Sequence, residues 1–173
     1  MAEIKIPRKV IFFAGFIYSD NDDLREALSE MEKICGKTFL TAGSFAFNHT
    51  GYYDSMGSNL KKYFAAYEPL SSRELIANIK IFSNSAENKF KSGGNRRVNI
   101  DPGFLSASNV CLASCKEYYH RIYIGNGIYI ENEYYWSKGD YVFFDWTYPD
   151  YKQKEYLDFF RNLRASYMTK LNG

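Results

Sequence analysis

The chain has 173 residues, of which 46% are hydrophobic and 18% aromatic, and its formal net charge is +2. This length and hydrophobic share predict a folded domain rather than a disordered chain, and no apolar run approaches the roughly 20 residues that span a bilayer. An odd number of cysteines and an N-terminus without an apolar signal segment predict a cytoplasmic protein with reduced thiols and no membrane partner.

The first hundred residues alternate between strand and helix patterns. Apolar runs, the first with Gly15 inside it, indicate strands, and apolar residues at helical spacing indicate amphipathic helices. Ser71 and Glu74 have the spacing of a capping box, which marks the start of the second helix. The predicted strands are residues 9–18, 38–47, 61–70 and 96–100, and the predicted helices are residues 22–35 and the segment from the capping box to about residue 91.

This order, β-α-β-β-α-β, is that of the ferredoxin-like fold, in which two helices cover one face of an antiparallel sheet. We therefore predict an α+β fold with a ferredoxin-like core. A β-hairpin around residues 125–127, a strand over residues 141–146 and a final helix that begins near Asp150 extend this core. No linker separates the parts, so residues 1–173 are predicted to form a single domain.

A polar, basic stretch surrounds the fourth predicted strand. Arg96, Arg97 and Asn99 lie in this strand. Asp101 and Pro102 then have the character of an N-cap and a first helical residue, so a short helix is expected to begin there. A helix N-terminus attracts anions, and the arginines would strengthen this attraction. Alternatively, Asp101 is only a cap and the arginines form a solvated edge.

Three further basic residues follow this expected helix. Lys116, His120 and Arg121 stand between its end and the next strand, where they could bind a phosphate or a carboxylate. His120 could serve as a general acid or base near neutral pH, and Asp101 is the second candidate catalytic residue. The alternative is that the charges only favour the helix dipole and the histidine is packed structurally.

Known catalytic and metal-binding motifs give little further guidance. Cys111, Cys115 and His120 could be metal ligands, but the fourth would have to be His49, which is remote in sequence, so we expect buried thiols and no metal. The sequence has no phosphate-binding loop, nucleophile elbow or HExxH motif. Glu131 and Glu133 are two positions apart, so both would point to the same face of a regular strand. This spacing suits either a pair of carboxylates or a solvated strand face.

Three motifs resemble an uncharacterised bacterial family of unknown function. They are VNIDPGFL (residues 98–105), HRIYIGNGIYIE (residues 120–131) and WTYPDY (residues 146–151), and the similarity extends over essentially the whole chain. Some members are labelled GTP-binding proteins, so the resemblance implies a nucleotide ligand, although no GTPase loop is present. Membership of these motifs adds Trp146 and Asp150 to the candidate ligand-binding residues.

Two functions remain open from the sequence. The first is the binding of an anionic small molecule, such as a nucleotide, with or without catalysis. The second is a non-enzymatic RNA-binding or protein-interaction module, in which exposed rings such as Tyr63 and Tyr67 would stack on bases. The net charge neither demands nor excludes a basic face for RNA. Rings that lie under helices would rule out this stacking.

Overall fold

The computed structural model describes residues 3–48 and 51–172. The helices in this part are α1 (Asn21–Cys35), α2 (Ile76–Lys89) and α3 (Lys154–Asn172), with short 3-10 segments η1 (Gly51–Met56), η2 (Arg73–Leu75) and η3 (Pro149–Lys152). The strands of the main sheet are β1 (Ile11–Tyr18), β2 (Lys37–Ala46), β3 (Lys61–Glu68), β6 (Val98–Leu105), β7 (Asn109–Ser114), β8 (Ile122–Gly125), β9 (Ile128–Ser137) and β10 (Asp140–Phe143). A small separate hairpin contains β4 (Lys91–Ser92) and β5 (Asn95–Arg96).

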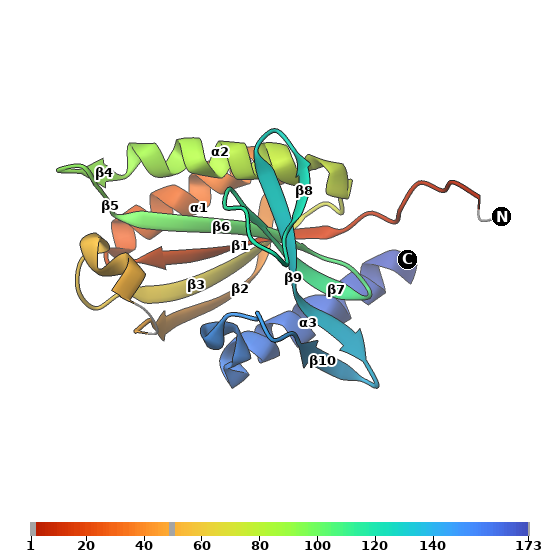
Figure 1. The fold of residues 1–173 in the computed structure, drawn as a ribbon. Helices are drawn as coiled ribbons and strands as arrows, with labels where there is room; N and C mark the ends of the chain where they lie inside the picture. Colours follow the sequence, from red (N-terminus) through yellow and green to blue (C-terminus); the bar gives the residue numbers. More distant parts are fainter. Residues whose placement is uncertain (1–2, 49–50, 173) are drawn as a thin grey trace.

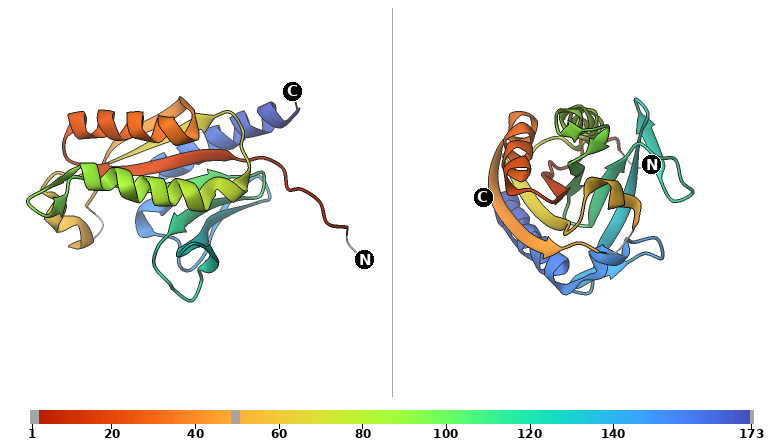
Figure 2. Two further views of the ribbon diagram at one scale, coloured as in Figure 1. Left: turned by 90° about the horizontal axis from the view of Figure 1, so that it is seen from above. Right: turned by 90° about the vertical axis from the view of Figure 1, so that its left-hand side faces the viewer.

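The main sheet follows the order β10-β9-β7-β6-β1-β3-β2, and β8 pairs with β9 beside this path. All of its neighbouring pairs are antiparallel. Helices α1 and α2 cover one face around β1, whereas α3 packs on the other face (Figure 1, with further views in Figure 2). The predicted mixed α+β architecture with a mostly antiparallel sheet is therefore confirmed.

Strand β1 lies between two hydrophobic cores. Phe12 and Phe16 pack into the core beneath α1 and α2, while Ile11 and Phe13 point into the core that includes α3. Since successive side chains of a strand alternate between its faces, a strand covered on both sides needs apolar residues throughout. This double coverage explains the nearly continuous apolar run that identifies β1 in the sequence.

The prediction of a short helix beginning at Asp101 and Pro102 is wrong. Both residues lie inside β6, which pairs with β1 over its whole length, with Asp101 opposite Gly15. After β6 the chain turns back as β7, so Cys111 belongs to a strand. Burial of alternate β6 side chains in both cores outweighs the local capping preference of the Asp-Pro pair.

The remaining boundaries differ by a few residues. The strand predicted over residues 141–146 is shorter, because β10 ends at Phe143. The final helix begins at Lys154, and Asp150 lies in the preceding η3 segment. In the described ranges, no helix is long and apolar enough to cross a membrane.

Candidate functional site

A cavity of about 790 Å³ opens where β6 and β7 part. The two strands are paired only from Gly103 to Leu105 of β6, so Asn99 and Asp101 have β1 on one side and no paired strand on the other within the described chain. Pro102, at the point of separation, has no N–H to contribute to a ladder. The cavity is lined by residues of β1, β3, α2, the small β4–β5 hairpin, β6, β7, β9 and the segments η1 and η3.

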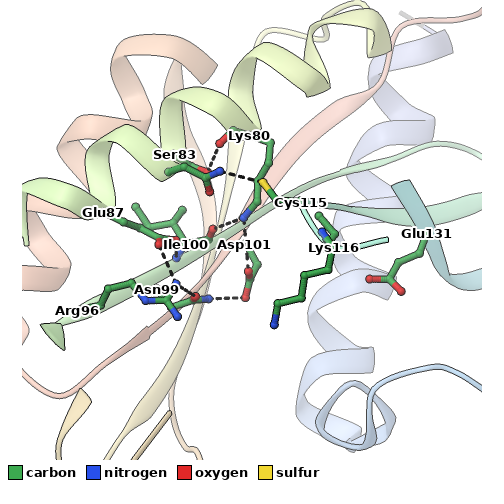
Figure 3. A network of polar contacts seen from close by, with 12 residues as sticks. Lys80, Ser83, Glu87, Arg96, Asn99, Ile100, Asp101, Cys115, Lys116 and Glu131 are labelled. Atoms are coloured by element: carbon green, nitrogen blue, oxygen red, sulfur yellow. Dashed lines mark hydrogen bonds and ion pairs between the residues drawn. The ribbon is translucent and has the colours of Figure 1, made fainter. Parts of the chain in front are cut away.

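Two side chains of α2 satisfy the free backbone edge of β6. Lys80 Nζ donates to the carbonyl oxygen of Ile100 (3.1 Å), and Glu87 Oε1 accepts from the Ile100 N–H (2.7 Å). Arg96 donates to Glu87 Oε2 (3.0 Å) and to Asn99 Oδ1 (3.0 Å). These bonds, drawn in Figure 3, replace those that a neighbouring strand would make to Ile100.

Asp101 lies at the centre of the polar network. Its carboxylate accepts a hydrogen bond from Asn99 Nδ2 (2.7 Å) and stands 3.7 Å from Lys62 Nζ and 3.8 Å from Lys80 Nζ. Burial alone would raise the pKa of Asp101, but the two ammonium groups, together with the Asn99 hydrogen bond and the charge of Arg96, outweigh it, and the pKa falls below its ordinary value. Asp101 is therefore a carboxylate at neutral pH, held between two cations.

Lys62 is buried in the cavity wall, with 2% of its surface exposed. The aromatic rings of Phe47, Phe64 and Tyr151 surround its ammonium group, with centroids 5.6 to 5.9 Å from Nζ. Gly15 provides the space, because a Cβ there would stand 2.9 Å from Lys62 Cε. Within the described residues no hydrogen-bond acceptor is found for the amine, so Asp101 is its polar neighbour.

Lys116 and two tyrosines stand at the rim of the cavity. Lys116 Nζ donates to the hydroxyl of Tyr52 (2.8 Å) and lies 4.0 Å from the centre of that ring. Tyr148 also lines the cavity, and its hydroxyl accepts a hydrogen bond from Arg121 (2.8 Å). Lys116 and Glu131 face the same open space as Asp101 (Figure 3).

His120 lies behind the cavity wall. Its Nε2 is 2.5 Å from Glu131 Oε2, and Arg121 binds the other oxygen of that carboxylate at 3.0 Å. The imidazole stacks on Trp146 at 5.1 Å with planes 5° apart, and only 7% of the side chain is exposed. Glu131 lines the cavity, whereas His120 and Trp146 do not. A catalytic role for His120 stays a prediction. Among the cavity-lining residues, the imidazole contacts Glu131.

The structure brings together five of the nine predicted site residues, which line the cavity: Arg96, Asn99, Asp101, Lys116 and Asp150. His120 contacts the cavity wall through Glu131, and Arg121 contacts it through Glu131 and Tyr148. Arg97 points elsewhere and forms an ion pair with Asp23 at the start of α1 (3.1 Å).

The sequence reasoning missed Lys62, Lys80 and Glu87. Each lies in a strand or helix whose sequence pattern indicates core packing. The pattern therefore does not predict that these three side chains point into a shared cavity. Gly15, inside an apolar strand, was the available signal, because such a glycine often marks the close approach of another group. In the structure that group is Lys62.

The residues considered for a metal site and for base stacking have other surroundings in the structure. No cluster of three or more His, Cys, Asp and Glu side chains that could hold a metal occurs in residues 3–48 and 51–172, and His49 lies outside the described residues. Tyr67 is completely buried in the core beneath α1 and α2, and Tyr63 packs partly buried against it. Tyr67 is therefore not available for base stacking, and one side of the Tyr63 ring is covered by the same core.

Comparison with known proteins gives one match. A family model described as a domain of unknown function, DUF4416, matches residues 8–167, a range that contains every β-strand of the main sheet. No curated protein and no solved structure matches the chain.

Proposed function

The chain belongs to this uncharacterised family, and we propose that it is a cytoplasmic, single-domain protein that binds an anionic small molecule in the cavity between β6 and β7. On this proposal β6, β1, β3 and β2, with α1 and α2, are a ferredoxin-like core that supports the site. The antiparallel order β6-β1-β3-β2 supports that description.

The observation that carries the proposal is the buried ammonium group of Lys62. Burying a charge is costly unless it is paired and hydrogen-bonded. Lys62 has Asp101 at 3.7 Å, but Asp101 is shared with Lys80. Two cations around one carboxylate leave a positive excess, and an anionic ligand would balance it.

The other lining residues support the same ligand class. The cavity wall carries five Lys and Arg side chains and four Asp and Glu side chains. One of these acids, Glu131, is already paired with Arg121 from outside the cavity. A volume of about 790 Å³ suits a ligand of nucleotide or sugar-phosphate size, since small-molecule sites span roughly 300–1,000 Å³.

A thermal-shift screen tests the proposal. The panel contains nucleoside phosphates, sugar phosphates, and 2-oxo and other small organic acids, and we expect at least one class to raise the melting temperature. Lys116→Gln should weaken the binding of that ligand about tenfold, the equivalent of roughly 1.4 kcal/mol. The variant should keep the stability of the wild type, because Lys116 is exposed. Lys33→Gln is the matched control, since its exposed ammonium lies on α1. A folded protein that responds to no member of the panel would contradict the proposal.

A further inference from the structure

We infer that the ligand of the proposed cavity is an anionic aldehyde or ketone, and that Lys62 condenses with its carbonyl group to form an imine. The inference rests on the proposed function, because the ligand must first enter that cavity. It goes further by naming a reactive group on the ligand and a covalent step on the protein.

The surroundings of Lys62 suit a nucleophilic amine. A lysine reacts with carbonyl groups when it is desolvated or stands beside another cation, and when a neighbour can take its proton. Lys62 meets these conditions: it is 2% exposed among three aromatic rings, and its Nζ and that of Lys80 flank the same carboxylate, Asp101. In the described chain, the Lys62 ammonium donates no hydrogen bond to a protein acceptor, and its ion-pair partner Asp101 stands 3.7 Å away.

The proton balance of the step uses Asp101 twice. Asp101 first takes a proton from the Lys62 ammonium, and the free amine adds to the carbonyl carbon to form a carbinolamine. Asp101 then returns the proton to the carbinolamine hydroxyl, which leaves as water. The products are a protonated imine on Lys62, one water molecule and the Asp101 carboxylate, so the total charge is unchanged.

Other residues of the cavity would hold the anionic part of the substrate. Lys80 approaches the other carboxylate oxygen of Asp101 from the one that Lys62 approaches, and Lys116 lines the same cavity. A carboxylate or phosphate bound by these lysines would keep the carbonyl group near Lys62. A 2-oxo acid and a phosphorylated aldehyde share this combination of groups, and the experiment separates them.

Borohydride trapping tests the inference. The full chain is incubated separately with pyruvate and with glycolaldehyde phosphate, reduced with sodium borohydride, and analysed by intact mass and peptide mapping. We expect one reduced adduct per chain with at least one of the two probes, and we expect it on the peptide that contains Lys62. Lys62→Met should abolish the adduct, and Lys61→Met, the adjacent lysine of β3, should retain it. Asp101→Asn should slow trapping about a hundredfold.

The outcomes separate this inference from the proposed function. If a ligand from the thermal-shift panel binds but neither carbonyl probe is trapped, the imine is refuted and anion binding stands. Labels spread over exposed lysines would also refute it. If Lys62→Met does not fold, the peptide map of the wild-type chain still decides the matter, because an adduct located elsewhere contradicts the assignment.

Discussion

Glu133 gives the sharpest test of the electrostatics near the cavity. Its side chain is completely buried in β9; one carboxyl oxygen accepts from the Tyr148 N–H (3.2 Å), and the other has no hydrogen-bond partner in the described chain. Burial, reinforced by the nearby Glu131 and Asp150 carboxylates, raises the pKa of Glu133 from 4.5 to about 8. The residue is therefore protonated in the folded protein at neutral pH.

The sign of the pH effect follows from this pKa. Between pH 4.5 and about 8 the folded state keeps a proton that the unfolded chain has released, so stability falls as the pH rises through this window. The pKa difference corresponds to about 5 kcal/mol at its full extent, at 1.36 kcal/mol per pKa unit. The stability that the folded protein gains from keeping this proton is fully present below pH 4.5 and is lost above pH 8.

Glu133→Gln removes this titration and keeps the shape of the side chain. We expect the variant to be about 3 kcal/mol more stable than the wild type at pH 8, after allowing for a buried amide with an imperfect set of partners. That gain corresponds to roughly 6–12 °C in melting temperature for a chain of this length. Thermal and urea unfolding from pH 5 to pH 9 would measure it, with Glu155→Gln on the exposed face of α3 as the control. Parallel stability curves for wild type and Glu133→Gln would refute the reasoning.

Three further predictions concern the cavity. Gly15→Ala should cost about 1–3 kcal/mol of unfolding free energy and prevent imine trapping, because the new Cβ would stand 3.1 Å from Lys62 Nζ and displace the amine. Preserved trapping would contradict this. Glu87→Ala should cost about 1–3 kcal/mol in urea unfolding by leaving the Ile100 N–H without its acceptor, and Glu87→Gln should cost less; equal losses would show that the hydrogen bond is unimportant. Cys115 should account for the single fast equivalent in a thiol titration, because burial raises the pKa of the other two cysteines to about 12. Cys115→Ser should remove that equivalent, and a fast equivalent that remained would contradict the assignment.

Local patterns were sufficient to predict most elements of the fold. The apolar run of β1, the amphipathic pattern of α1 and the turn at residues 125–127 depend on neighbours in sequence, and the structure confirms all three. The helix predicted at Asp101 failed because the conformation of β6 is set by its pairing with β1, some 85 residues earlier in the chain. A capping preference acts within a few residues and cannot register such a pairing.

The candidate site was predictable only in part, for a related reason. Polar residues in the strand and turn motifs drew attention to Asn99 and Asp101, and both line the cavity. Lys62 and Lys80 belong to elements that also pack the core, so neither periodicity nor composition could reveal that their ammonium groups meet at Asp101. Such a meeting depends on the distance between a strand and a helix, which a single sequence does not encode locally.

The incomplete pairing of β6 connects the fold to the proposed chemistry. A strand edge left unpaired inside a protein must find other hydrogen-bond partners, and α2 supplies an ammonium and a carboxylate at Ile100. Those two charged groups need counter-charges of their own, which Asp101 and Arg96 provide. The opening between β6 and β7 is therefore lined by paired charges as a consequence of how the sheet divides. Lys62 is different, because nothing in the backbone requires an ammonium there, and its burial beside Asp101 points to a role in binding or chemistry rather than in closing the sheet.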